Sequence, residues 1–349
     1  MDKRNDFSIF QIRKYWLIFW GIVLAIVALT VALISTSTLA AQKNGQEESV
    51  THNGVNIKYY EYGDTKNPTV TVTGGWPWNS SGQIGQAKDL ANRGLHVIRW
   101  EQPGAGNSDH PSDENAYSLP SMAEDFGAVI DKAAPNQHIA VTGMGWGPTI
   151  ATEYSYSHPG RINALVSNGA PSLELGWKNL FTANQNMKTN PGSIPATVWQ
   201  DVALSYETGF AIPKIPQALA GLFSYAVNIF SALWVGDYKD VIQYPAYFFD
   251  NPTNVKDTTA GISKYSWFAK NRVLPNHLHN YIPINHVHVF NDTQDPIETS
   301  VLLQGLDKET PHLEQSDMDA NHISWTQGNN IKTVDQTTVD TIHEAQKDK

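Results

Sequence analysis

Short strand-like and helix-like segments alternate along the first half of the chain after residue 50. Runs of β-branched and apolar residues predict strands over 55–62, 69–73, 96–100, 138–142 and 162–167. Apolar residues at helical spacing predict helices over 85–93, 121–134 and 148–157. Strands and helices in alternation predict an α/β fold, with a mostly parallel sheet that carries helices on both faces.

The pattern changes in the second half. Residues 173–275 contain helix-like patches, many aromatic residues and frequent Pro and Gly, which predicts a helical cap inserted over the sheet. Strand alternation resumes at 286–290, and residues 335–345 have the spacing of a closing helix. The chain therefore divides into a core, formed by 51–172 and 276–349, and the inserted cap.

The amino-terminal region contains an uncharged apolar run at residues 15–34. Its length is that of a helix that crosses a bilayer. Because Lys and Arg precede it, we expect residues 1–14 in the cytoplasm and a single-pass protein of the cell membrane with its carboxyl-terminal domain outside. A polar spacer is expected at 35–50. A cleaved signal peptide is the alternative, since Thr-Leu-Ala at residues 38–40 resembles a small-residue cleavage site, and the domain would then be secreted.

Composition excludes some classes of function. The chain has 349 residues, of which 41% are hydrophobic, enough to build a substantial core. Its net charge of -10, without a basic block, argues against a nucleic-acid partner, because phosphate binding needs clustered Lys and Arg. The absence of Cys excludes disulfides, a thiolate nucleophile and a Cys-based metal site.

Four separated segments carry recognisable motifs. They are TGGWP at 73–77, WEQPGAGNSD at 100–109, GMGWG at 143–147, and the strand 286–290 with the loops that follow it. Together, over about residues 50–345, they resemble the α/β-hydrolase superfamily, in the cap-bearing branch that includes epoxide hydrolases, haloalkane dehalogenases and proline iminopeptidases. The resemblance implies an α/β-hydrolase fold with a helical cap.

The resemblance also implies site residues. Gly145 falls at the nucleophile position of the elbow between strand and helix, Asp295 at the position of the triad acid, and His322 at that of the base. The backbone N–H groups of Trp76 and Trp146 fall where the family forms its oxyanion hole. The elbow, acid and base occur in the order typical of the family.

Gly145 departs from the family pattern in the most consequential way, because glycine has no side chain with which to form a covalent intermediate. The leading expectation is therefore a protein without covalent nucleophilic catalysis that works as a ligand-binding or interaction protein at the cell surface. The alternative is an active hydrolase of esters, amides or epoxides in which the Asp295–His322 pair activates water directly.

The expected ligand is small and apolar or peptidic, because part of the aromatic cap can line an apolar pocket. By resemblance, a cap tyrosine would polarise an epoxide oxygen, and the candidates are Tyr206, Tyr225, Tyr238, Tyr244 and Tyr247. Two H-x-H pairs, at 277–279 and 286–288, suggest metal binding. No acidic third ligand has a suitable spacing, so neither a metal nor a cofactor is expected.

Overall fold

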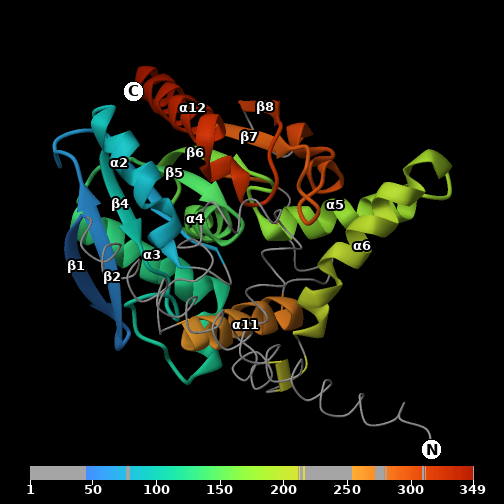
Figure 1. The fold of residues 1–349 in the computed structure, drawn as a ribbon, viewed down its shortest axis with the longest axis horizontal. Helices are drawn as coiled ribbons and strands as arrows, with labels where there is room; N and C mark the ends of the chain where they lie inside the picture. The colour runs from blue at the N-terminus through green and yellow to red at the C-terminus, as the bar shows by residue number, and fades with distance from the viewer. Residues whose placement is uncertain are drawn as a thin grey trace, which may run out of the picture.

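An eight-stranded sheet forms the centre of the computed structural model (Figure 1), in the order β1-β2-β4-β3-β5-β6-β7-β8. The strands are β1 (Gln46–His52), β2 (Val55–Tyr62), β3 (Thr69–Thr73), β4 (His96–Trp100), β5 (Ile139–Met144), β6 (Ile162–Asn168), β7 (His286–Asp292) and β8 (Leu313–Met318). β2 is antiparallel to both β1 and β4, and the remaining pairs are parallel. The prediction of a mostly parallel sheet is confirmed.

The structure describes residues 45–75, 79–210, 212, 215, 216, 254–271, 279, 281–308, 310 and 312–348. The apolar run at 15–34, predicted to span the membrane, lies outside them. Among the described residues, no helix combines the length and the apolar character needed to cross a bilayer.

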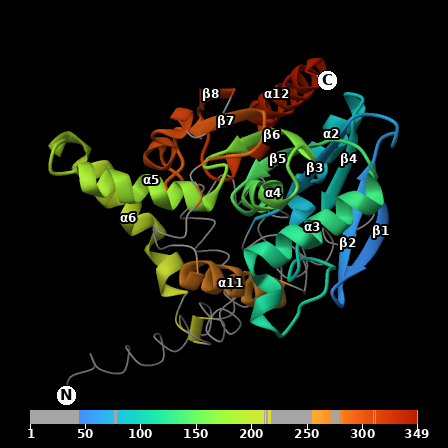
Figure 2. The same cartoon turned by 180° about the vertical axis from the view of Figure 1, so that it is seen from behind.

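Helices cover both faces of the sheet, as Figures 1 and 2 show from opposite sides. α2 (Ile84–Asn92) and α12 (Gly328–Lys347) pack on one face, against a cluster that includes Val70 and Val97. α3 (Leu119–Ala133) and α4 (Trp146–Ser157) contribute to the larger cluster on the other face. Because both faces are covered, the central strands are buried throughout, as parallel strands usually are.

The two edge strands were not predicted. Residues 46–50, expected to belong to a polar spacer, form most of β1, and the polar segment 313–318 forms β8. The spacer prediction is therefore wrong for these residues. Hydrophobicity gives little signal at the edge of a sheet, where polar side chains stay in solvent and the strand is held by backbone hydrogen bonds to one neighbour.

The cap enters the core between β6 and β7. Its described helices are α5 (Leu173–Asn186), α6 (Ile194–Gly209) and α11 (Asn254–Asn271), and residues 217–253 lie outside the described part. The ring of Trp146, at the start of α4, packs edge-on against Tyr265 and Phe268 of α11, with centroids 5.1 and 6.0 Å away. The cap therefore rests on the end of β5, where the site lies.

Short 3-10 helices complete the connections. They are η1 (Ser80–Gln83), η2 (Glu114–Tyr117), η3 (Pro191–Ser193), η5 (Ser300–Leu303), η6 (Leu306–Lys308) and η7 (Ser324–Thr326).

Candidate active site

The turn between β5 and α4 has the backbone shape of an elbow. Gly145 has φ 60° and ψ -114°, in a region that residues with a side chain occupy only under strain. Gly147 allows close packing, since a Cβ there would lie 2.9 Å from the Thr73 side chain. A Cβ at residue 145 would meet only Oε1 of Glu298, at 3.7 Å, which is an ordinary contact. The elbow thus keeps its shape and the space for a side chain.

Asp295 and His322 lie together beside this turn. Asp295 follows β7, and His322 lies in the loop between β8 and η7. Nδ1 of His322 lies 2.7 Å from Oδ2 of Asp295, whose side chain is fully buried. The other oxygen, Oδ1, accepts the backbone N–H groups of Ile297 and Glu298 at 2.7 and 3.0 Å. Asp295 is thereby fixed with one oxygen aimed at the imidazole.

Charged neighbours favour the protonated form of His322. Burial lowers the pKa of its imidazole, but the carboxylates of Asp295, Glu298 and Asp292 outweigh burial and raise the pKa to about 9. An imidazolium held between carboxylates is the state that a triad acid stabilises.

Glu298 is one of the site residues that sequence reasoning missed. Its side chain is buried, and Oε2 accepts the backbone N–H of Ala170 at 2.8 Å. Burial raises the pKa of its carboxyl to about 8, against the lowering effect of His322. No family motif marks this position. The one signal in the sequence is that Glu298 lies three residues after Asp295, which indicates that it is near the site.

A cavity of about 50 Å³ opens between the elbow and the cap. Gly145, Glu298 and His322 all line it. Its apolar wall is formed by Leu173, Trp177, Leu204, Ile297, Leu302 and Trp325. One water molecule needs roughly 10–15 Å³ of such space, so the cavity has room for several waters or a small organic group.

Two tyrosines form the cap side of the cavity. Tyr206 comes from α6 and Tyr265 from α11, and their rings lie 5.7 Å apart, edge to face. Burial is the main cause that raises the pKa of both hydroxyls well above the ordinary value, so both are neutral and can donate hydrogen bonds. Tyr206 was among the predicted candidates and Tyr265 was not, while Tyr225, Tyr238, Tyr244 and Tyr247 lie outside the described residues.

Glu207 adds a further buried carboxyl to the cap side of the cavity. It accepts the indole N–H of Trp177 at 2.8 Å and the hydroxyl of Tyr206 at 3.4 Å. Burial raises its pKa to about 7, although both donors lower it. Near neutral pH, the cavity therefore holds carboxyls close to their midpoints of titration.

Of the two backbone donors expected for an oxyanion hole, only Trp146 is described. It is the first residue of α4, where helical N–H groups lack a partner within the helix. Trp76 lies outside the described residues. The neighbouring Gly74 is held by Gln102, whose side-chain amide donates to its carbonyl oxygen at 3.0 Å and accepts from Lys264 of α11 at 2.8 Å. The cap thus also contacts the loop after β3.

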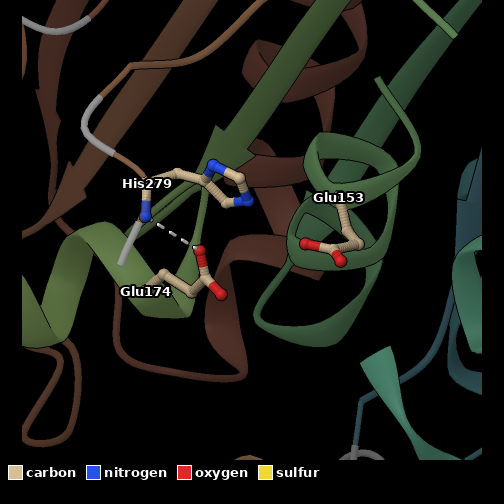
Figure 3. A group of neighbouring side chains, drawn as sticks. All are labelled: Glu153, Glu174 and His279. Carbon is tan, nitrogen blue, oxygen red and sulfur yellow. Dashed lines mark hydrogen bonds between the residues drawn. The ribbon is translucent and has the colours of Figure 1, made fainter. Parts of the chain in front are cut away.

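A separate group of possible metal ligands lies at the base of the cap (Figure 3). Glu153 of α4, Glu174 of α5 and His279 before β7 place one ligand atom each within 4.8 Å of one another. Oε2 of Glu174 also accepts the backbone N–H of His279 at 3.4 Å, which joins the two ends of the inserted cap. Sequence spacing does not reveal this group because its carboxylates come from elements that are distant from His279 in the chain.

Two of the other predicted histidines pair with exposed carboxylates elsewhere. His286 pairs with Asp348 at 2.9 Å, and His288 pairs with Glu314 at 3.2 Å. His277 lies outside the described residues.

Comparison with known proteins identifies relatives of the chain. The family model for the alpha/beta hydrolase fold matches residues 68–326, well over half of the chain. "Probable oxidoreductase EphD" of Mycobacterium bovis is 28% identical over 48% of this chain and 28% of its own length. "Epoxide hydrolase A" of Mycobacterium tuberculosis is 28% identical, covering 36% of this chain and 39% of its own. A proline iminopeptidase of Saccharolobus solfataricus is 31% identical, covering 36% and 42%.

The chain therefore spans less than half the length of these curated relatives. Among solved structures, an epoxide hydrolase of Bacillus megaterium in complex with an inhibitor superposes with a TM-score of 0.62 and 17% sequence identity. The superposition covers 85% of this chain and 100% of that one. At this identity, the likeness concerns the fold.

Proposed function

The chain belongs to the α/β-hydrolase fold family, and from this premise we propose that it hydrolyses a small apolar electrophile. In this proposal the Asp295–His322 pair activates the attacking water, and no covalent bond forms to residue 145. The observation that carries the proposal is the 2.7 Å contact between the two side chains beside a cavity that Gly145 also lines. An Asp–His pair can act as a general base toward water even where residue 145 has no side chain.

An epoxide is the substrate class that the cavity favours. Ring opening leaves a negative charge on the epoxide oxygen, and neutral Tyr206 and Tyr265 can donate a proton to it from the cap. The apolar wall suits a hydrocarbon substituent. Two of the similar proteins, from M. tuberculosis and B. megaterium, are described as epoxide hydrolases.

We further propose that residues 15–34 anchor the protein in the cell membrane and place the hydrolase domain outside. The uncharged run and the preceding basic residues support this orientation. Retention of the full-length protein in the membrane fraction, with the domain accessible to protease added outside cells, is the expected result. Release of the domain into the medium would instead support signal cleavage.

A second candidate function is binding of the same kind of ligand without turnover. Gly145 favours this candidate, because loss of the triad nucleophile lowers kcat roughly 10⁶-fold in subtilisin. In that case the buried carboxyls and tyrosines would only recognise the ligand.

Turnover of probe substrates separates the two candidates. The full-length protein is incubated with styrene oxide and, separately, with p-nitrophenyl acetate, and diol and p-nitrophenol are measured. Formation of diol that is lost in His322→Ala supports the hydrolase. Binding of styrene oxide, seen as a shift in thermal unfolding, without diol formation would support the binding protein and contradict the hydrolase.

A further inference from the structure

We propose that Glu298 is the carboxylate nucleophile of this site, supplied from the loop after β7 in place of a side chain at residue 145. This inference rests on the proposed hydrolase function and specifies what the activated water attacks. The main observation is the position of Oε1 of Glu298. This oxygen faces the elbow and lies 3.7 Å from the point that a Cβ of residue 145 would occupy.

The surrounding backbone is built around this carboxylate. Gly169 has φ 74°, and a Cβ there would lie 2.2 Å from Oε2 of Glu298. Any other residue at 169 would displace the carboxylate. The next residue, Ala170, donates its N–H to the same oxygen at 2.8 Å. One oxygen of Glu298 is therefore fixed by the end of β6, and the other is left facing the elbow.

Oε1 of Glu298 lies next to the space that a side chain on residue 145 would enter, because only 3.7 Å separates it from the position of a Cβ there. The same space adjoins the start of α4, where the N–H of Trp146 is expected to stabilise an oxyanion. An ester carbonyl on Glu298 would therefore lie beside the family's usual oxyanion donor.

The arrangement also leaves a place for water. Glu298 and His322 both line the cavity, and their charges act on each other. Within the described part of the chain, the ion pair of His322 is with Asp295 and not with Glu298. A water molecule can thus lie between the imidazole of His322 and an ester formed on Glu298. From this place, the water can hydrolyse the ester in a second step.

The reaction with an epoxide then balances in two steps. Oε1 of Glu298 attacks a ring carbon, a C–O ester bond forms, the ring C–O bond breaks, and a hydroxyl of Tyr206 or Tyr265 gives its proton to the alkoxide. His322 then takes a proton from water while the hydroxide attacks the ester carbonyl. As the ester C–O bond breaks, the proton of the added hydroxide passes to the leaving alkoxide, so the diol is released and Glu298 is regenerated as a carboxylate. The proton on His322 then returns to the tyrosinate.

The alternative role for Glu298 is purely electrostatic. Its charge would then favour the imidazolium of His322 without any bond to substrate. This alternative predicts that removing the charge lowers the pKa of His322 and leaves turnover in place, whereas the nucleophile role predicts that turnover is lost.

Oxygen labelling distinguishes the roles. The full-length protein, in excess over styrene oxide, completes a single turnover in heavy-oxygen water, and the diol and the peptide containing Glu298 are analysed by mass spectrometry. If Glu298 is the nucleophile, the heavy oxygen enters its carboxyl, and the first diol carries an unlabelled oxygen from the protein. If the heavy oxygen appears in the diol and not in Glu298, direct attack by water is correct: our inference is overturned, and the proposed hydrolase function stands. If no diol forms at all, both are overturned.

Variants of Glu298 provide the second measurement. Glu298→Gln is expected to lose at least about 10³-fold in kcat, and Glu298→Asp to recover part of it because a carboxylate remains. Glu314→Gln, in which an exposed glutamate near the start of β8 is changed, serves as the control with unchanged rate. Full activity of Glu298→Gln, with its pH profile displaced to lower pH, would establish the electrostatic role and overturn the inference. Thermal unfolding verifies that each variant folds.

Discussion

Nδ1 of His322 lies 2.7 Å from Oδ2 of Asp295, a residue 27 positions earlier in the chain. The contact fixes the ring so that its other nitrogen is available to the cavity. Asp295→Asn is expected to reduce kcat for styrene oxide by roughly 10³–10⁴, because the amide favours the wrong tautomer and no longer stabilises the imidazolium. Steady-state kinetics of the full-length protein measures the loss.

The matched control for this variant is Asp319→Asn, since Asp319 is exposed and lies three residues before His322. It should retain the wild-type rate. Equal rates for Asp295→Asn and Asp319→Asn would show that the pair has no part in catalysis.

Turnover should increase with pH above neutrality. Burial raises the pKa of Glu298 to about 8, and that of His322 is raised to about 9 because Asp295, Glu298 and Asp292 outweigh its burial. The proposed steps require ionised Glu298 and neutral His322, and both forms become more populated as the pH rises through 8 and 9. Glu207, which faces the same cavity with a pKa raised to about 7, is ionised before either. A rate that is constant or falls between pH 7 and 9 would be incompatible with these roles.

Gly145→Ser should add an esterase activity. A Cβ fits at this position, and its hydroxyl would face the cavity that His322 lines, which restores a nucleophile, base and acid in the family order. The positive φ is expected to cost about 1–3 kcal/mol of stability. We expect a burst of p-nitrophenol from p-nitrophenyl acetate, followed by slower turnover.

Gly145→Ala is the control for the serine variant, because it carries the same backbone strain without a hydroxyl. Both should unfold at a similar, lowered temperature. If the two variants release p-nitrophenol at the same rate, then the hydroxyl is not positioned for attack.

Asp335→Asn should stabilise the protein at higher pH. Asp335 is buried on α12 and accepts the side-chain amide of Gln86 at 3.1 Å, and the nearby carboxylate of Asp89 adds to the rise of its pKa. Burial raises its pKa from 3.8 to about 8, so between these values the folded state holds a proton that the unfolded state releases. Stability from this group therefore falls as the pH rises to about 8.

The Asn side chain keeps an oxygen that can accept from Gln86 and has no acidic proton to lose. The gain in the midpoint of thermal unfolding should be small near pH 4 and largest at pH 8 and above. Asp340→Asn, at an exposed position of the same helix, should show no such gain. A gain that does not depend on pH would mean that ionisation of Asp335 is not the cause.

The fold could be predicted because its central strands are buried on both faces. Residues 69–73 and 96–100 are continuous runs dominated by β-branched and apolar residues, and the predicted strands match β3 and β4 in full. The motifs also led to Asp295 and His322, which the structure brings together. Asp295 follows the buried strand β7, and His322 lies in the loop before the closing helix α12, so both positions depend on local motifs and on the order of the elements.

The rest of the site depends on packing between distant elements. Glu298 is recognised only through the space that Gly169 leaves for it and through its distance from the elbow, and no sequence spacing contains that information. Tyr265 faces the cavity because α11 packs on Trp146, more than a hundred residues away in the chain. The edge strand β1 was mistaken for a spacer because its side chains are polar.

The most direct test of the hydrolase assignment is the dependence of turnover on the imidazole of His322. Styrene oxide hydrolysis is measured for the full-length protein and for His322→Ala, each with and without added imidazole. The account predicts diol formation by the wild type, a loss of at least about 10³-fold in His322→Ala, and partial recovery with imidazole in the variant alone. Wild-type turnover that His322→Ala retains, or a wild type that forms no diol, would contradict it.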